Sequence, residues 1–198
     1  IDPLMVAYHA VRKSGIRLQD KVLVIGAGII GQMIGALAKK AGASYVAMSK
    51  TSDRKLPMMQ KIGDFDAYFD GKAPDRAQQM KEATNGGFDL VFEAVGTEQS
   101  LAACIDGVKP GGKIIMIGNS IPPTIPFSMN RVVLQEIQLI GSVSCTREEF
   151  TQTIDLIANR VIDPEKYVSD ILPLDQLQTA FERLTSPNDP VVKLVIRP

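Results

Sequence analysis

The sequence is poor in the side chains that bind metals or form disulfides, with one histidine and two cysteines. Cys104 and Cys145 are far apart, and their spacing matches neither a disulfide framework nor a metal-binding motif. His9 lies at helical spacing in LMVAYHAV, as an ordinary helix residue would. We therefore predict no metal site and no catalytic residue in this chain, and a reducing, cytoplasmic compartment.

An excess of charge is also absent, because 22 lysines and arginines balance 22 aspartates and glutamates. A non-specific nucleic-acid or membrane-surface binder needs a basic excess, so we expect neither partner. No apolar run approaches the ~20 residues of a membrane span, and the N-terminus lacks the features of a signal peptide. The sequence begins at Ile1 rather than methionine, so we expect a processed chain or a longer parent polypeptide.

Short apolar runs alternate with helical patterns up to residue 141. Runs such as VLVI and IIMI are nearly continuous in apolar residues, which is typical of strands buried on both faces of a parallel sheet. The predicted strands are Lys21–Ile25, Ser44–Ser49, Asp66–Phe69, Phe88–Glu93, Lys113–Ile117 and Gln138–Gly141. The predicted helices are Ile29–Ala41, Arg54–Ile62, Pro74–Thr84 and Glu98–Val108. This order predicts an α/β fold, a Rossmann doubly wound six-stranded parallel sheet with helices on both faces.

Glycine and proline positions support these boundaries. Gly42 stands where the first crossover helix would end in a left-handed cap. Pro110-Gly111-Gly112 is expected to turn the chain into the fifth strand. Pro57 conflicts with the second crossover helix, so we expect that helix to begin late or to be irregular.

Beyond Gly141 the pattern changes to a short α+β tail. A capping box from Thr146 to Glu149 opens a helix that Asp163-Pro164 would end. The apolar face of this helix comprises Phe150, Ile154, Ile157 and Val161. The inner face of a second predicted helix comprises Leu177, Ala180, Phe181 and Leu184, and a strand over Val191–Ile196 ends the chain. The tail breaks the alternation, so we expect it to form a separate structural unit.

The sequence Gly26-Ala27-Gly28-Ile29-Ile30-Gly31 follows the first strand directly and opens a helix. In this context GxGxxG is typical of a dinucleotide site. Gly26 permits a tight turn, Gly28 lets backbone approach a pyrophosphate, and Gly31 allows close helix–strand packing. The helix N-terminus adds free N–H groups and a positive dipole end. The alternative is that the glycines serve packing alone.

Lys50 occupies the end of the second strand, where NAD-binding proteins place an acidic residue that accepts hydrogen bonds from the adenosine ribose. A cation is a poor partner for ribose hydroxyls but a good one for a 2′-phosphate. Arg54 and Lys55 follow, and Ser49 and Ser52 could donate hydroxyls. This favours NADP over NAD, although NAD stays possible and the run could be ordinary surface charge.

Together, the motifs VLVIGAGIIG, FDLVFEAVG, VKPGGKIIMIG, QLIGS and LDQLQTAFERL resemble the medium-chain dehydrogenase/reductase superfamily, over essentially the whole chain. The zinc-dependent branch of alcohol, polyol and threonine dehydrogenases is the most similar. The resemblance implies that Gly26, Gly28 and Gly31, with the N–H groups of Ile29 and Ile30, hold the pyrophosphate. It implies that Ser49 and Lys50 select the cofactor. It implies that Ala94, Val95 and Gly96 border the adenosine and nicotinamide ribose. It also implies that the backbone of Ile117, Gly118 and Asn119, with Ser142 and Val143, fixes the nicotinamide carboxamide.

The same resemblance implies a part that this sequence lacks. In the family a substrate domain of roughly domain size precedes such a chain and carries the catalytic zinc ligands. We therefore expect residues 1–143 to form the dinucleotide-binding domain. Residues 144–198 would form a segment that packs on the substrate domain. The small-molecule alcohol or carbonyl substrate would bind through that missing domain.

Three functions fit the sequence. The first is the cofactor-binding portion of an NADP-dependent, zinc-type alcohol or polyol dehydrogenase, which transfers hydride between substrate and nicotinamide. This portion is expected to be inactive alone. The second is a non-catalytic nucleotide-binding or regulatory module. The third is an S-adenosylmethionine methyltransferase, which shares a glycine loop but also needs an acid where Lys50 stands.

The segment from Pro122 to Met129 suggests self-association. Ile125, Phe127 and Met129 alternate with smaller or polar residues, so one face offers three apolar side chains. The resemblance implies that such a segment pairs with its two-fold mate at the sheet edge, which would satisfy unpaired backbone groups in both copies. We expect a homodimer or tetramer, and the alternative is a loop that folds back on its own domain.

Overall fold

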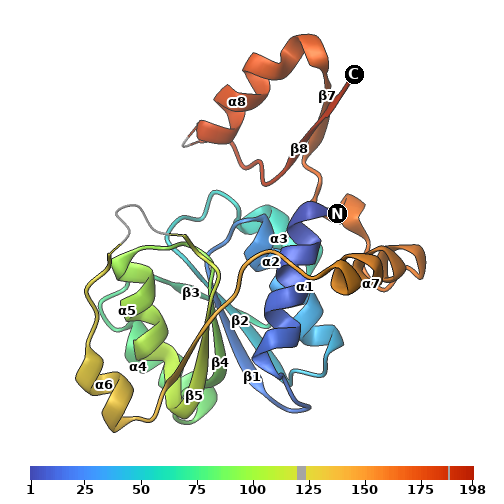
Figure 1. Ribbon diagram of the computed structural model, residues 1–198. Helices are drawn as coiled ribbons and strands as arrows, with labels where there is room; N and C mark the ends of the chain where they lie inside the picture. The colour runs from blue at the N-terminus through green and yellow to red at the C-terminus, as the bar shows by residue number, and fades with distance from the viewer. Residues whose placement is uncertain (120–123, 187) are drawn as a thin grey trace.

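A six-stranded parallel sheet forms the centre of the computed structural model, which describes residues 1–119, 124–186 and 188–198 (Figure 1). Its strands are β1 (Lys21–Ile25), β2 (Tyr45–Lys50), β3 (Ala67–Asp70), β4 (Phe88–Glu93), β5 (Val108–Met116) and β6 (Gln138–Gly141). Their spatial order is β3-β2-β1-β4-β5-β6, with parallel neighbours throughout. The order reverses between β1 and β4, as in a doubly wound sheet. The predicted fold class is confirmed.

Helices cover both faces of this sheet (Figure 1). On one face lie α1 (Asp2–Ser14), α2 (Ile29–Lys40) and α3 (Leu56–Ile62), and on the other lie α4 (Arg76–Thr84), α5 (Glu98–Gly107) and α6 (Met129–Leu134). Within β1, Val22 and Val24 join the first core cluster while Leu23 and Ile25 join the second. Successive strand residues point to opposite faces, so both must be apolar. This double burial explains why the strand sequences are continuously apolar.

The boundaries follow the sequence signals with one clear exception. Gly42 has φ 100°, as the left-handed prediction requires. The helix α3 begins at Leu56 with Pro57 in its first turn, so the late start is confirmed. The prediction that Pro110-Gly111-Gly112 precedes the fifth strand is wrong. These residues lie inside β5, where the register with β4 shifts between Phe88 and Leu90.

The tail contains more elements than the sequence pattern indicated. They are α7 (Arg147–Ala158), the 3₁₀ helix η1 (Pro164–Tyr167), β7 (Asp170–Pro173), the 3₁₀ helix η2 (Leu174–Gln176), α8 (Leu177–Thr185) and β8 (Leu194–Arg197). The strands β7 and β8 pair in parallel, and Ala180, Val191 and Leu194 form a small core of their own. Ile162 and Tyr167, in contrast, belong to the main core. The tail is therefore separate only after η1, and a domain boundary at residue 144 stays a prediction.

The predicted inner face of α8 is wrong for most of its residues. Ala180 is 3% exposed, whereas Leu177, Phe181 and Leu184 are exposed. On α7, Phe150, Ile154 and Val161 are likewise exposed, and the buried residues are Glu149 and Thr153. The pattern located apolar faces, but a buried face also needs a partner element. Ile157 is the member of the predicted α7 face that packs against the main core.

Two tail boundaries also differ from the prediction. The helix α7 ends at Ala158 rather than at Asp163, whose carboxylate instead accepts from the Glu165 N–H (3.1 Å) and caps η1. The final strand begins at Leu194 rather than at Val191, because Val191 packs into the small core ahead of the strand.

Candidate functional site

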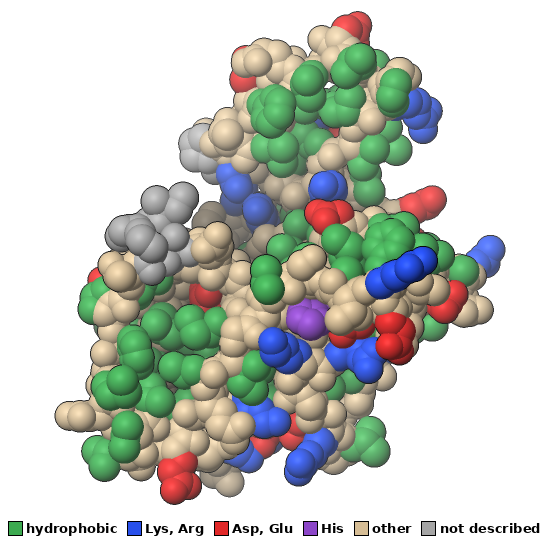
Figure 2. All heavy atoms as spheres, viewed as in Figure 1, with side chains coloured by type: hydrophobic (Ala, Val, Ile, Leu, Met, Phe, Trp, Pro, Cys, Tyr) green, Lys and Arg blue, Asp and Glu red, His purple; other side chains and the backbone are tan. Residues whose placement is uncertain are grey.

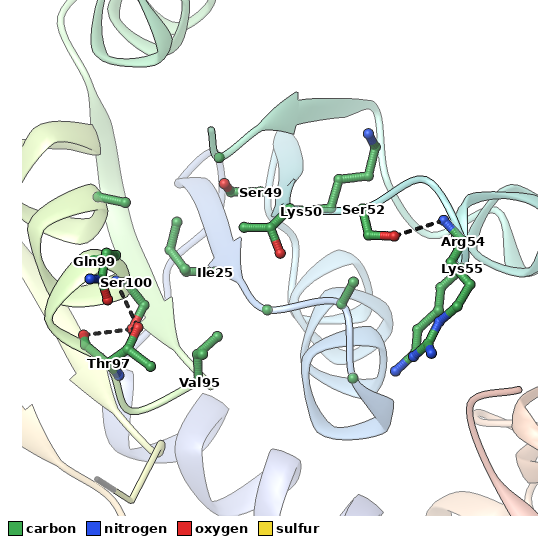
Figure 3. A pocket seen from close by; sticks show the side chains of 16 residues that line it. Ile25, Ser49, Lys50, Ser52, Arg54, Lys55, Val95, Thr97, Gln99 and Ser100 are labelled. Atoms are coloured by element: carbon green, nitrogen blue, oxygen red, sulfur yellow. Dashed lines mark hydrogen bonds between the residues drawn. The ribbon is translucent and has the colours of Figure 1, made fainter. Parts of the chain in front are cut away.

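A cavity of about 450 Å³ opens at the carboxyl ends of β1 and β2, beside the point where the strand order reverses (Figure 3). Doubly wound sheets bind their ligands at this position. The walls come from the glycine loop, the segment after β2 and the first turns of α5. The lining residues are Ile25, Gly26, Ala27, Gly28, Ser49, Lys50, Thr51, Ser52, Arg54, Lys55, Gly71, Val95, Thr97, Gln99, Ser100 and Ala103.

The three glycines of the loop play different structural roles. A Cβ on Gly31 would lie 2.0 Å from the Gly26 carbonyl oxygen, and one on Gly26 would lie 2.8 Å from the Val95 side chain. A Cβ on Gly28 would meet nothing within 4 Å. Gly26 and Gly31 therefore close the loop on itself, as predicted from their spacing. Gly28 caps α2 at its N-terminus and leaves space open where a ligand could contact the free N–H groups of Ile29 and Ile30.

The predicted cofactor-selecting residues lie on one wall of the cavity, but two have partners elsewhere. Ser49 is buried at the end of β2. The Lys50 ammonium pairs with Asp53. The Arg54 guanidinium donates to the carbonyl of Ser186, in the loop between α8 and β8. A sequence pattern cannot reveal such a contact with a main-chain carbonyl from a distant element.

Lys55, which follows Arg54 in the sequence, belongs to the same wall. Burial, together with the neighbouring charge of Arg54, lowers the pKa of its ammonium below the usual lysine value. No ion pair of Lys55 occurs among residues 1–119, 124–186 and 188–198. An incoming anion would therefore find here a partly desolvated amine, which is a strong electrostatic partner.

The opposite wall is the N-terminus of α5, and Figure 3 shows its side chains across the cavity from Ser49 and Lys50. Thr97 and Ser100 form a reciprocal capping box, with Ser100 N donating to Thr97 Oγ1 (3.1 Å) and Thr97 N to Ser100 Oγ (2.9 Å). Neither residue was predicted from the sequence to line the site. The Thr-x-x-Ser spacing at the start of a predicted helix could have located this wall.

Most of the remaining predicted residues lie outside this cavity, at the carboxyl ends of β4 and β5. Here the turn of Ala94, Val95 and Gly96 touches the turn of Ile117, Gly118 and Asn119. Gly96 has φ 85°, and a Cβ on it would lie 2.7 Å from the Asn119 carbonyl oxygen. The structure thus brings these six residues together, and only Val95 also lines the cavity.

Ser142 and Val143 follow β6, one strand further along the sheet. The Ser142 N–H donates to the Met116 carbonyl (2.8 Å), and the side chain is buried without a hydrogen-bond partner for Oγ among the described residues. Val143 is 83% exposed. The sequence-predicted contacts therefore divide into a cavity group and a group that continues along the same edge of the sheet.

The side chains that could bind a metal ion do not form a cluster in the described residues. The structure shows no group of three His, Cys, Asp or Glu side chains that could hold a metal ion in the residues that it describes. His9 Nδ1 lies 2.8 Å from a Glu149 carboxylate oxygen, and burial and the nearby charge of Glu93 raise the pKa of the Cys104 thiol. No helix within the described ranges has the length and hydropathy to cross a bilayer.

Comparisons with known proteins agree with the fold. Residues 30–159 match the family model described as zinc-binding dehydrogenase. Over its whole length the chain is 29% identical to (R,R)-butanediol dehydrogenase of Neisseria gonorrhoeae and 32% identical to L-arabinitol 4-dehydrogenase of Hypocrea jecorina. It covers 56% and 53% of those two proteins. The chain thus spans about half the length of the curated relatives that it matches.

Solved structures of dehydrogenases have the same fold over about half of their length. The chain superimposes on 2R,3R-butanediol dehydrogenase from Bacillus subtilis with a TM-score of 0.87 and 26% identity. That match covers 100% of this chain and 56% of the other. For alcohol dehydrogenase TADH from Thermus sp. ATN1 the TM-score is 0.88 at 27% identity, with 99% of this chain and 56% of that chain covered.

Proposed function

Because this chain belongs to the zinc-binding dehydrogenase family, we propose that it is the cofactor-binding portion of a longer, nicotinamide-dependent alcohol or polyol dehydrogenase. One observation carries the proposal: the cavity at the carboxyl ends of β1 and β2, with Gly28 open toward it at the N-terminus of α2. The relatives are named as dehydrogenases of butanediol and arabinitol, which supports a small polyol or alcohol as the substrate class.

The residues present fit a nicotinamide dinucleotide. Gly28, Ile29 and Ile30 would hold the pyrophosphate through their backbone N–H groups. The anion can approach them because Gly28 has no side chain and the space beside it is open. Ser49 and Lys55 would contact the adenosine half. The two turns at the ends of β4 and β5, with Ser142 and Val143, would flank the nicotinamide half. When bound, the cofactor would accept or donate the hydride.

The described residues do not fit a zinc site, since no cluster of three ligand side chains exists among them. We expect the isolated chain to bind no stoichiometric zinc and to oxidise no simple alcohols. Elemental analysis and a turnover assay test this expectation, and either stoichiometric zinc or turnover would refute it. A non-catalytic nucleotide-binding module remains the alternative function. It predicts that the longer protein containing this chain also lacks turnover.

The charge at the end of β2 favours NADP over NAD. Lys50 must leave Asp53 to reach a 2′-phosphate, but Asp53 is 79% exposed and such pairs contribute only about 0–1 kcal/mol. A charge-assisted contact with the phosphate contributes ~1.5–3 kcal/mol, so the exchange favours the phosphate. Arg54 already donates to a carbonyl, a bond of comparable strength, and is expected to stay there.

The fold by itself does not separate the two cofactors. A zinc-binding dehydrogenase from Sinorhizobium meliloti with this fold is described as bound to NADP, and an alcohol dehydrogenase from Escherichia coli CFT073 as complexed with NADH. They are 24% and 19% identical to this chain, so the choice must be argued from Lys50 and Lys55.

Calorimetric titration with both cofactors tests the proposal. We expect NADP to bind roughly 10- to 150-fold more tightly than NAD, and Lys50→Asp to reverse that order. Lys13→Asp is the matched control, since Lys13 is exposed near the C-terminus of α1, away from the cavity. Equal affinities, or tighter NAD binding by the unmodified chain, would contradict the cofactor preference. No binding of either cofactor would contradict the proposed function.

A further inference from the structure

Glu93 is the last residue of β4 and is 1% exposed, yet neither the glycine motif nor the cavity includes it. Its carboxylate Oε1 accepts hydrogen bonds from Val95 N and Gly96 N, both at 2.9 Å. Its backbone carbonyl accepts from Ile117 N (2.9 Å) and Gly118 N (3.0 Å). A single residue therefore fixes both turns at the ends of β4 and β5.

The second carboxylate oxygen of Glu93 makes this arrangement unfavourable for the stability of the fold. Oε2 has no hydrogen-bond partner among the described residues, and no lysine or arginine of that part of the chain pairs with the carboxylate. A buried carboxylate with one unpaired oxygen is destabilising, and an apolar side chain would avoid that penalty. An acid at this position therefore has a role other than filling the core.

The contacts around Oε2 indicate that role. A Cβ on Gly118 would lie 2.5 Å from Oε2 and 2.3 Å from Gly96 N, so the carboxylate sits directly against the place where the two turns meet. Glutamate reaches from the end of β4 back to the N–H groups of its own turn, which no apolar side chain could bind. Its charge strengthens those two bonds.

We infer that Glu93 is a positioning residue, whose carboxylate holds the 94–96 and 117–119 turns in the arrangement that receives the nicotinamide half of the cofactor. This inference rests on the proposed function. It assigns no contact between Glu93 and the ligand, because the side chain is enclosed by the turns. The adenosine half would bind mainly at the other side of the glycine loop, where Ser49 and Lys55 lie. Of the two turns only Val95 also lines that cavity, so the adenosine half is expected to depend on Glu93 far less than the nicotinamide half does.

That division supplies the test. Glu93→Met keeps the volume of the side chain but removes the acceptor. We expect its affinity for NADP to fall about tenfold or more, as for lost bonds to a charged acceptor, while adenosine 2′,5′-bisphosphate binds nearly as before. Glu93→Gln keeps an acceptor oxygen and should restore most NADP affinity. Glu82→Met, at an exposed position on α4, is the control.

A second variant covers the case in which Glu93→Met does not fold. Gly118→Ala retains the carboxylate but displaces it and separates the turns, so the same selective loss is expected. The fluorescence of the bound NADPH nicotinamide ring gives a readout besides affinity, and it should shift toward that of free cofactor in both variants. Equal losses for NADP and the bisphosphate, or no loss for either, would overturn the inference. If the unmodified chain bound neither ligand, the proposed function itself would fail.

Discussion

Gly28 and Gly31 occupy one short loop but respond to different constraints. The Gly31 position is closed by the Gly26 carbonyl at 2.0 Å from a built Cβ, and main chain cannot move aside as a flexible side chain can. The Gly28 position is open within 4 Å and has φ −75°, a conformation that any residue adopts. We therefore propose that Gly28 serves ligand approach, whereas the contacts at Gly31 show that it serves packing.

This contrast predicts different outcomes for two alanine substitutions. Gly31→Ala should lower the free energy of unfolding by ~1–3 kcal/mol or more, as overpacking does. Gly28→Ala should fold with nearly unchanged stability but bind NADP weakly, because its methyl group would occupy the space reserved for the pyrophosphate. Chemical denaturation and calorimetry on both variants separate the effects. The interpretation is wrong if Gly28→Ala binds NADP like the unmodified chain.

At the residue scale the glycine loop could be located from the sequence, but the partners of the charged residues at and after the end of β2 could not. The spacing of Gly26, Gly28 and Gly31 encodes local geometry, so their roles could be predicted. The pairing of Lys50 with Asp53 and the bond from Arg54 to Ser186 depend on side-chain conformation and on a distant loop. Glu93 could not be predicted as a site residue either, because its hydrogen bonds join two turns that meet only in the folded chain.

Polar side chains join α1 to α7, in addition to the apolar packing of Leu156 and Ile157 against the main core. Tyr8 and Arg12 donate to Gln152 Oε1 (3.1 and 2.7 Å), and His9 lies against the Glu149 carboxylate. Burial alone would raise the pKa of Glu149, but hydrogen bonds from Thr146 N and His9 outweigh it and hold the pKa below the usual glutamate value. The carboxylate form of Glu149 is therefore the form that binds α7 to α1.

A pH dependence follows from that depressed pKa. A carboxyl group with a lowered pKa in the folded state contributes stability above its unfolded pKa of about 4.3, and this is lost as pH falls through the folded value. Glu149→Gln should therefore reduce the melting temperature at neutral pH and differ little from the unmodified chain near pH 3. Asp155→Asn, an exposed change on α7, is the control. A constant difference across that pH range would contradict this account.

Elements were predictable where local pattern and tertiary burial coincide. The strands β1 and β4 have their predicted bounds because both faces of each are buried, and the capping box at Thr146 fixes the start of α7. The edge strand β6 also has its predicted bounds, although most of its residues are exposed. The helices α7 and α8 could not be oriented by pattern alone. Only Ile157 of the predicted α7 face packs against the main core and only Ala180 of the predicted α8 face is buried, so most of each face expected to point inward lies exposed.

At the scale of the whole molecule, the sheet ends at β6, and this edge differs from the prediction. Pro122 and Pro123 of the predicted edge segment lie outside the described residues. Residues 124–128 form no strand, Ile125 packs against the core and Met129 begins α6. The expected alternating face along this segment is therefore wrong. The free backbone edge belongs to β6 itself.

An apolar surface nevertheless surrounds that edge, toward the lower left of Figure 2, over α6 and the end of the sheet. The exposed side chains there are Phe127 (42%), Met129 (60%), Val133 (64%), Leu134 (83%), Leu139 (36%) and Val143 (83%). An exposed strand edge flanked by apolar side chains favours association, and pairing with a second copy satisfies both edges through one two-fold axis.

We therefore predict a homodimer in which two β6 edges meet and Phe127 and the helices α6 lie at the contact. Phe127→Asp places a charge in that contact and should shift the protein toward monomer, as measured by light scattering over a range of concentrations. The exposed faces of α7 and α8 could also cause association, so Phe181→Asp on α8 is the matched control and should leave a β6-paired dimer intact. A monomer at high protein concentration would contradict the model. So would a dimer that survives Phe127→Asp but dissociates with Phe181→Asp, because the contact would then involve the tail and not the edge of the sheet.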